Sequence, residues 1–276
     1  MRFKNLILIS FLLLTIGCSS NISNKNLIRI SGSNTMLELT RLLAEQFMKE
    51  NQGTSIKVDG IGTAAGIRSL LKGDADICTA SRNLSPAEAK ELADYYSSLG
   101  LVFLIAKDAL SIYTNISNRV NNLSTEQLKN IYESKVDNWK YLGGLDTSIQ
   151  VVTRNPNSGT YFYFKEHVLD GEDYTSNSVV LSTTKEVIQF IEEHSNAIGY
   201  GGMGYSGNFN KIKVDGIQPI EVNVINDSYP LSRYLHFFTT KTPSGEIKRF
   251  IDWVLSPEGQ SIVRKSGFIP LWENKL

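Results

Sequence analysis

The chain has 276 residues, 41% of them apolar, and equal numbers of basic and acidic side chains, 28 of each. This length allows two domains of ordinary size, and the lack of a basic excess argues against a nucleic-acid-binding protein. Three histidines and two cysteines without finger-like spacing exclude a zinc-cluster protein, so we expect no metal site and no cofactor.

The N-terminal segment has the pattern of an export signal. A basic start precedes the apolar run 6–16, and Cys18 directly follows a glycine. The run is too short for a membrane-spanning helix, which needs roughly 20 residues, although an N-terminal membrane anchor is the alternative. The cysteine is typical of a bacterial lipoprotein cleavage box, despite Thr15 at a position where leucine is usual. We predict a signal peptide over 1–17, lipid on Cys18 and a polar tether over 18–26.

Removal of this signal would change the charge balance only slightly. Because Arg2 and Lys4 lie in the signal, 26 of the 28 basic residues would remain against 28 acidic residues. Cys78 would be the one remaining thiol besides the lipid-bearing Cys18, so no intrachain disulfide is expected. It stands in an apolar run and is predicted to be a buried core residue. No long apolar run follows residue 16, so passage through a membrane would need another chain.

Short β-like runs alternate with amphipathic helical segments along the rest of the chain. The expected strands are 27–31, 56–58, 77–80, 101–105, 110–114, 150–153, 197–200, 217–224 and 235–239. The expected helices are 35–51, 67–72, 85–97, one starting at the capping box 124–127, 158–168, 183–194 and the interrupted segment after 239. This alternation favours parallel sheets built from βαβ units.

Four loops at predicted strand ends share one chemistry, with hydroxyls, glycines and arginine but no acidic residue. They are 31–35, 60–66, 81–83 and 154–160. Doubly wound sheets bind ligands where strand ends lead into helix N-termini, which offer unpaired N–H groups and partial positive charge. Glycine lets the backbone approach a ligand, and hydroxyls and guanidinium groups add donors. We expect these loops to bind a tetrahedral oxyanion.

The loop 154–160 is the most specific of the four, because a Ser-Gly-Thr run begins a helix four residues after Arg154. The alternative is a plain helix cap by Ser158, with Arg154 in a surface ion pair. The glycine loop 60–66 lacks the Gly-Lys-Ser/Thr of a Walker loop and the spacing of a dinucleotide fingerprint. For Arg82 the alternative is a solvated loop side chain.

Taken in order, these segments resemble the phosphate-binding protein of ABC-type phosphate uptake, which has the type II periplasmic-binding-protein fold. The similarity covers nearly the whole chain after the signal. It is carried by SGSNT at 31–35, GIGTAAG at 60–66, ADI at 75–77, ASR at 80–82, LS and QL at 123–128, NW at 138–139, Arg154 with SGT at 158–160, AIGY at 197–200, YPLSR at 229–233 and LSPEGQ at 255–260.

The resemblance implies an α/β fold of two doubly wound domains joined by two crossing strands, with the ligand in the cleft. Domain 1 is then discontinuous and comprises 27–107 plus 233–276, whereas domain 2 comprises 108–232. The chain would cross near 106–109 and return near 232–234. Hinge bending would close the two domains around the anion.

The resemblance also implies the binding residues, and no catalytic ones. The phosphate ligands would be Ser33, Asn34, Thr35, the Met36 amide, Thr63, Ser81, Arg82, Arg154, Ser158, Gly159 and Thr160. One position departs from the family pattern. Better-known members have an aspartate after the third-loop serine, where it accepts the proton of hydrogen phosphate, and this chain has Arg82. A backbone carbonyl or a hydroxyl would replace that acceptor, or Arg82 would favour the dianion through its charge.

We therefore predict high-affinity binding of inorganic phosphate for import through the permease and ATPase subunits of an ABC transporter. The protein would sit at the periplasmic face of the bacterial cell membrane, anchored by the lipid on Cys18. The alternatives are a receptor for sulfate or another oxyanion, an enzyme such as a phosphatase or serine hydrolase, and an adhesin or structural lipoprotein. An enzyme is disfavoured because the sequence has no Gly-x-Ser-x-Gly elbow.

Overall fold

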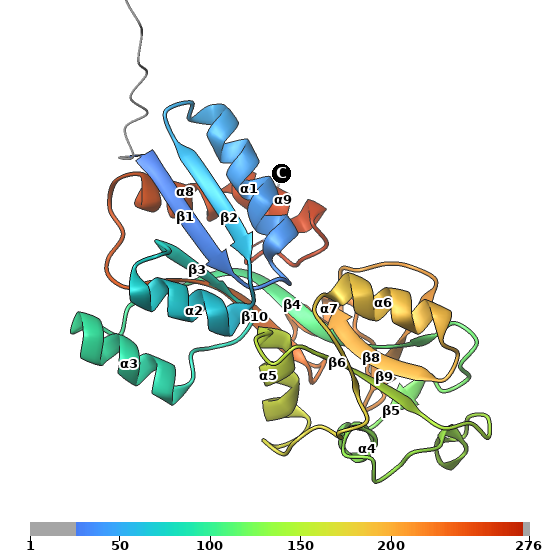
Figure 1. The fold of residues 1–276 in the computed structure, drawn as a ribbon. Coiled ribbons are helices and arrows are strands. Elements are labelled where there is room, and N and C mark those ends of the chain that lie inside the picture. The colour runs from blue at the N-terminus through green and yellow to red at the C-terminus, as the bar shows by residue number, and fades with distance from the viewer. Residues whose placement is uncertain (1–25, 273–276) are drawn as a thin grey trace, which may run out of the picture.

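The structure is a computed structural model that describes residues 26–272. Two lobes lie side by side, and the long strands β4 (Leu101–Asn115) and β10 (Ser232–Thr239) run between them (Figure 1). These crossing strands pair antiparallel, with Arg233 opposite Asp108. After Ala109 the partner of β4 changes from β10 to strands of the second lobe.

The first lobe is a mixed sheet covered by helices on both faces. Its strand order is β2-β1-β3-β10, with β1 (Leu27–Gly32), β2 (Ser55–Gly60) and β3 (Ile77–Ala80). In this sheet β1, β2 and β3 run parallel, and β10 runs antiparallel to β3. Its helices are α1 (Leu37–Glu50), α2 (Thr63–Lys72), α3 (Pro86–Tyr96), α8 (Gly245–Val254) and α9 (Pro257–Lys265). One apolar core joins the sheet to α1, α8 and α9, and another joins it to α2 and α3, because alternate strand residues face opposite sides.

The second lobe repeats this layering. Its strands are β5 (Asn122–Leu123), β6 (Gln150–Arg154), β7 (Val179–Leu181), β8 (Ala197–Gly202) and β9 (Phe209–Val214). Its helices are α4 (Thr125–Tyr132), α5 (Gly159–His167), α6 (Thr184–Glu193) and α7 (Glu221–Ile225), with a 3-10 turn at Trp139–Leu142. Again two apolar cores lie on opposite faces of the sheet. The predicted α/β class is confirmed.

The three predicted capping boxes are also confirmed. Ser85, Ser124 and Thr183 each accept a hydrogen bond from the backbone N–H three residues later, and the side chain there bonds back to the cap. Each box satisfies helix N–H groups that would otherwise lack partners. These short-range patterns therefore locate three helix starts.

Three local predictions are wrong. Segments 101–105 and 110–114 form one strand, because 106–109 stays extended through its pairing with β10. Residues 221–225 are helical rather than extended, since their β-branched residues do not override the local i→i−4 bonds. The glycine loop ends early, because α2 already begins at Thr63. Gly66 therefore lies inside that helix, where a side-chain carbon would stand 2.5 Å from the Gly32 Cα.

The segment after α9 links the lobes a third time. Phe268 packs into the core of the first lobe, whereas the next residue, Ile269, packs into a core of the second. Ile269 also exchanges two backbone hydrogen bonds with Lys107 on β4, at 2.8 and 2.9 Å. The sequence predicted only two crossings, so this third contact is a new feature of the connection between the lobes.

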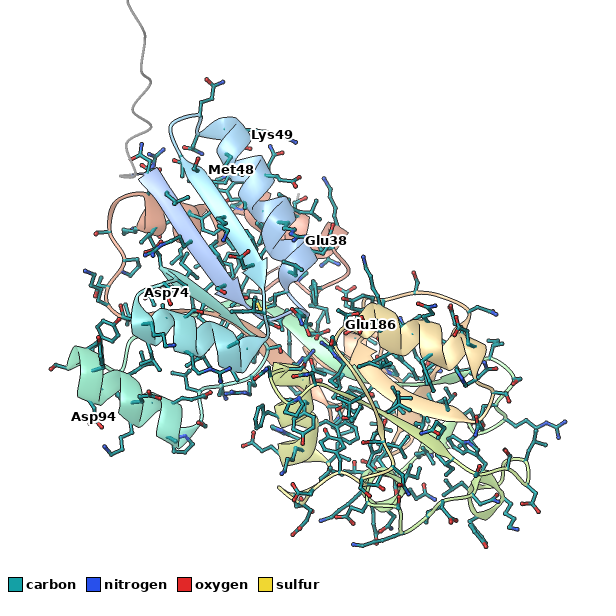
Figure 2. All side chains as sticks on the ribbon, viewed as in Figure 1. Glu38, Met48, Lys49, Asp74, Asp94 and Glu186 are labelled. Carbon is teal, nitrogen blue, oxygen red and sulfur yellow. The ribbon has the colours of Figure 1, made fainter. Side chains whose placement is uncertain are left out.

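Charged side chains of the first lobe such as Glu38, Lys49 and Asp94 point outward (Figure 2). Cys78 is fully buried, as predicted, and burial raises the pKa of its thiol. Within residues 26–272 no helix is long and apolar enough to cross a membrane. The predicted signal peptide and Cys18 lie outside the described residues.

Candidate anion-binding site

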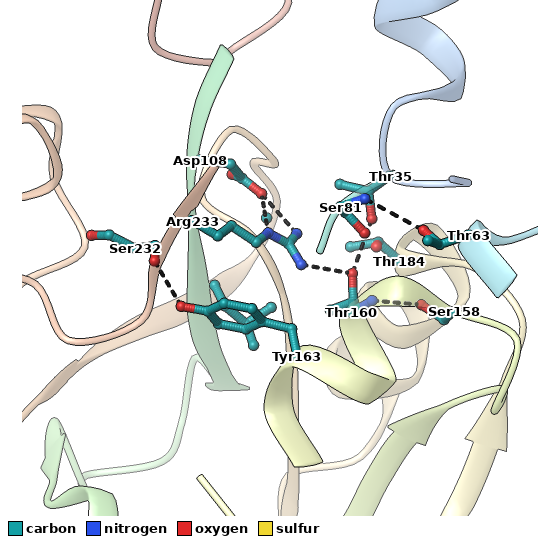
Figure 3. Close-up of polar contacts among 12 residues, drawn as sticks. Thr35, Thr63, Ser81, Asp108, Ser158, Thr160, Tyr163, Thr184, Ser232 and Arg233 are labelled. Atoms are coloured by element: carbon teal, nitrogen blue, oxygen red, sulfur yellow. Dashed lines mark hydrogen bonds and ion pairs between the residues drawn. The ribbon is translucent and has the colours of Figure 1, made fainter. Parts of the chain in front are cut away.

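Hydroxyl groups from both lobes converge where the lobes face each other (Figure 3). The Thr35 hydroxyl, before α1, lies 3.0 Å from the Thr160 hydroxyl at the start of α5. The Thr63 hydroxyl, in the first turn of α2, accepts a hydrogen bond from the Ser81 N–H at 3.3 Å. A side-chain carbon at Gly159 would lie 2.4 Å from the Thr63 hydroxyl and 2.6 Å from that of Ser81. The four predicted loops therefore meet at one place.

This cluster of hydroxyls is almost completely shielded from solvent. Thr63 and Ser81 are 0% exposed, and Thr160 is 1% exposed. Buried polar atoms nearly always have hydrogen-bond partners, yet the Ser81 hydroxyl has none among the described residues. A buried donor without a partner beside the other hydroxyls is free to bond a ligand oxygen.

The start of α5 presents both a cap and a donor. The Ser158 hydroxyl accepts a hydrogen bond from the Thr160 N–H at 3.2 Å, so Ser158 does cap the helix. Because Thr160 points its own hydroxyl toward Thr35, the same turn also supplies a side chain to the cluster. Capping and ligand binding are thus compatible at this helix start, whose N–H groups carry partial positive charge.

Arg154, at the end of β6, is a buried cation. Its side chain is 0% exposed, and its two Nη atoms donate to the Thr184 hydroxyl and the Ser182 carbonyl, each at 2.8 Å. No carboxylate within 26–272 forms an ion pair with it, and its Nε has no partner there. Burial lowers the pKa of Arg154, but an arginine stays protonated. The surface ion pair considered from the sequence is excluded, and an unpaired buried cation favours an anionic ligand.

A second buried guanidinium comes from the crossing strands. Arg233 on β10 donates from Nε and Nη2 to Asp108 Oδ2 on β4, at 3.0 and 2.7 Å. Its Nη1 donates to the Thr160 hydroxyl at 3.0 Å. Neither Arg233 nor Asp108 was among the predicted ligands. The available signal was the charged pair Lys107-Asp108 between two largely apolar halves of the strand sequence.

The comparisons with known proteins agree with this geometry. The family model of the PBP superfamily domain matches residues 19–258. The chain belongs to the PBP superfamily. The family resemblance and the type II fold inferred from the sequence are therefore confirmed.

Individual members of the superfamily cover most of this chain. Phosphate-binding protein PstS of Bacillus subtilis is 31% identical over 254 residues, which are 90% of this chain and 81% of that protein. A Clostridium perfringens structure, described as a phosphate ABC transporter substrate-binding protein with bound phosphate, has a TM-score of 0.82 and 34% identity, covering 90% of this chain and 100% of the other. An ABC-type phosphate transport receptor of Vibrio cholerae has a TM-score of 0.76 and 30% identity, covering 88% and 99%.

Two contacts at the rim join the lobes of this PBP-superfamily protein. The Asn34 side chain donates to the Ser182 carbonyl at 3.3 Å, which also accepts from Arg154. The carbonyl of Asn157 accepts from the Ala64 N–H at 3.3 Å. Asn34 therefore lies at the rim and bridges the lobes, rather than within the hydroxyl cluster.

Two other predicted ligands hold the first loop together. The Met36 N–H donates to the Ser33 carbonyl at 3.1 Å, and the Ser33 N–H donates to the Thr79 carbonyl at 2.9 Å. The Met36 side chain is fully buried in the first-lobe core. The Met36 amide thus has an acceptor within its own loop, and its role as a phosphate ligand stays a prediction.

Arg82 is held by a neighbouring carboxylate. Its Nη atoms bond both oxygens of Glu88, each at 2.7 Å, and also the Asn83 carbonyl. Its guanidinium carbon lies 5.0 Å from the centre of the Phe162 ring. Arg82 is 8% exposed, so it is not a solvated loop residue. Glu88 neutralises and orients Arg82, and contact between Arg82 and the anion stays a prediction.

Proposed function

We propose that this protein binds inorganic phosphate between its lobes and delivers it to the permease and ATPase subunits of an ABC transporter. The observation that carries the proposal is the buried cluster in which hydroxyls of both lobes accompany the unpaired Arg154. The relatives named PstS and the phosphate-bound Clostridium perfringens structure support phosphate as the oxyanion.

In this proposal the anion takes the place of hydrogen bonds between side chains of the cluster, such as the one between Thr35 and Thr160. Thr35, Thr63 and Ser81 donate from the first lobe, and the start of α5 donates from the second. Arg154 supplies the positive charge, and hydrogen bonds to charged groups contribute about 1.5–3 kcal/mol each. Because the donors come from both lobes, an anion that bonds them all stabilises the closed arrangement.

We also propose that the lobes are two domains, 27–107 plus 233–276 and 108–232, which close by bending at the crossing strands. The change of strand partner after Ala109 supports a boundary near that residue. The contacts of Ile269 with the second lobe add a tether to this hinge.

A binding protein is favoured over an enzyme by the positions of the three histidines. His167 and His194 each contact a carbonyl of their own helix and stack on a neighbouring ring. His236 is buried, which lowers its pKa to about 4. None of the three forms a hydrogen bond to Ser158 among the described residues, so this serine has no histidine base of the kind that activates a nucleophile.

We propose further that the protein is exported and lipid-anchored through Cys18 at the periplasmic face of the membrane. The signal pattern supports this assignment. Mass spectrometry of the mature protein should find the lipid on Cys18. A soluble mature protein with an unmodified Cys18 would exclude the anchor.

Calorimetric titration of the signal-less protein with phosphate and sulfate in parallel tests the ligand. Arg154→Ala should weaken phosphate binding at least about tenfold, since it removes a charged hydrogen-bond donor. Arg249→Ala is a matched control, because this arginine is 58% exposed and pairs with Glu246 within α8 of the first lobe. Unchanged affinity in Arg154→Ala, or equal binding of sulfate by the unmodified protein, contradicts the proposal.

A further inference from the structure

Thr184, the first residue of α6, contacts the buried Arg154. Its hydroxyl accepts a hydrogen bond from Arg154 Nη1 at 2.8 Å, and the Ser182 carbonyl accepts one from Nη2 at the same distance. Thr184 and Arg154 are both buried, so their hydrogen bond is shielded from solvent. Thr184 was not among the predicted ligands, and its contact suggests a role that acts through the arginine.

The segment 182–184 that holds the arginine is itself fixed by backbone contacts. It follows β7, whose Leu181 pairs with Arg154 in the register of β6 and β7. The N–H groups of Ser182 and Thr183 both donate to Glu186, at 2.8 and 2.9 Å, within the capping box of α6. Strand pairing and a helix cap therefore set the positions of both acceptors relative to the arginine.

The Thr184 side chain has little freedom to rotate. A side-chain carbon at Gly201 on β8 would lie 2.4 Å from Thr184 Cγ2, so the threonine methyl group fills the space that this glycine leaves. Branching at Cβ already restricts χ1, and the packed methyl group directs the hydroxyl to one place. Burial raises the pKa of Tyr205, whereas Arg154 and a hydrogen bond with Thr184 lower it. The phenol of Tyr205 therefore supports the same hydroxyl.

These contacts fix the guanidinium and leave most of its donors available. An arginine has five N–H donors in a rigid planar fork, and Thr184 and Ser182 bond one on each Nη atom. Arg154 Nε has no partner among residues 26–272. Because the fork is planar, holding both Nη atoms also fixes the directions of the donors that remain.

The two acceptors of Arg154 are also neutral. The other buried arginines of the described residues are each bound by a carboxylate. Glu88 binds Arg82, and Asp108 binds Arg233. A carboxylate orients a guanidinium but offsets the positive charge that an anion would meet. A hydroxyl and a carbonyl orient it without adding a charge, so Arg154 keeps its full attraction for an anion.

We propose that Thr184 is a positioning residue for phosphate binding: its hydroxyl orients the Arg154 guanidinium for the anion without neutralising it. The inference rests on the proposed function and deepens it. Both residues belong to the second lobe, so their contact does not depend on the approach of the first lobe. The arginine is then ordered in advance, and less side-chain entropy is lost when phosphate binds.

The test is a double-mutant cycle on phosphate affinity, measured by calorimetry. Thr184→Val keeps the shape of the side chain and removes the hydroxyl, so it should raise the phosphate Kd about fivefold, as for loss of one hydrogen bond. In an Arg154→Ala background the same substitution should change the Kd less than about twofold, because no guanidinium is left to position. An unchanged Kd in Thr184→Val, or equal losses in both backgrounds, overturns the inference.

Two further variants separate the hydroxyl from general effects on the fold. Thr184→Ser keeps the hydroxyl and should bind phosphate within about twofold of the unmodified protein. Thr239→Val is the matched control, because Thr239 is a buried threonine of the first lobe whose hydroxyl donates to the Lys241 carbonyl at 2.8 Å. Its Kd should also stay within about twofold. A loss in either variant equal to that of Thr184→Val overturns the inference.

A smaller substitution covers the case in which Thr184→Val does not fold. Thr184→Ala removes the hydroxyl without placing an apolar group against Arg154, and the same cycle then decides by the same outcomes. Absence of phosphate binding in the unmodified protein, or an unchanged Kd in Arg154→Ala, contradicts the proposed function instead. The failure of the inference and the failure of the proposed function are therefore distinguishable.

Discussion

Two arginine–carboxylate pairs of this protein lie near the cleft, and they differ in how the carboxylate is used. Glu88 gives both oxygens to Arg82 and also accepts from the Ser85 N–H in a capping box. Asp108 gives one oxygen to Arg233 and keeps the other without a partner among the described residues. The difference teaches that burial is common to both pairs, whereas of the two arginines only Arg233 donates to a hydroxyl of the cluster.

Position in the sequence alone would favour Arg82 as the arginine of the binding site. Arg82 follows a strand end in a loop predicted to bind the ligand, whereas Arg233 and Asp108 stand inside strands. Arg82 is bound by Glu88, six residues later in the capping box of α3. Arg233 instead donates to the Thr160 hydroxyl of the cluster. Three measurements, taken from the largest expected effect to the smallest, can break or sharpen this comparison.

Matched lysine substitutions should separate the two arginines. Arg233→Lys should raise the phosphate Kd at least about tenfold, because an ammonium cannot hold Asp108 and reach Thr160 together. Arg82→Lys should change it less than about threefold, since its contacts serve Glu88. Calorimetry of both folded variants checks this expectation, and equal losses of affinity would remove the distinction.

Glu88→Gln should affect stability rather than binding. Burial raises the pKa of Glu88, but hydrogen bonds from Arg82 and Ser85 outweigh it, so the pKa lies below its ordinary value. A carboxylate with a lowered folded-state pKa stabilises the protein above its unfolded pKa, and this stabilisation is lost as the pH falls through the folded pKa. We expect Glu88→Gln to lower the free energy of unfolding at pH 7 by about 1–3 kcal/mol.

Urea unfolding at several pH values measures this effect. Below about pH 4.5 the difference between the unmodified protein and Glu88→Gln should shrink, while the phosphate Kd at neutral pH stays the same within about twofold. A difference in stability that is independent of pH would show that the ionised form of Glu88 is not what stabilises the loop.

The smallest change in free energy is expected from Phe162→Leu. Phe162 belongs to the second lobe, and the Arg82 guanidinium of the first lobe lies over its ring, so this contact supports closure. Cation–π contacts contribute about 0.5–1 kcal/mol, which corresponds to a two- to fivefold increase in the phosphate Kd. Phe190→Leu, on α6, is the control ring. A loss larger than that of Arg233→Lys would place Arg82 and its ring within the binding machinery.

Features that depend on neighbouring residues were predictable from the chain. The capping boxes, the helix start at Ser158 and the donor-rich loops follow short-range rules of hydrogen bonding and turn chemistry. The order of strands and helices predicted the class of fold, and loops at strand ends predicted where an anion would bind. Even the convergence of Thr35, Thr63, Ser81 and Thr160 follows from this order.

Partners distant in sequence were decided by the tertiary structure. Asp108 and Arg233 are separated by 125 positions and become opposite residues only when β4 pairs with β10. Ile269 joins the second lobe for the same reason, because its partner Lys107 lies on a strand far away in the chain. The sequence alone thus determined where donors gather, since that is local chemistry. Which charged groups meet them depends on strand pairing and burial, which act between segments that no local pattern connects.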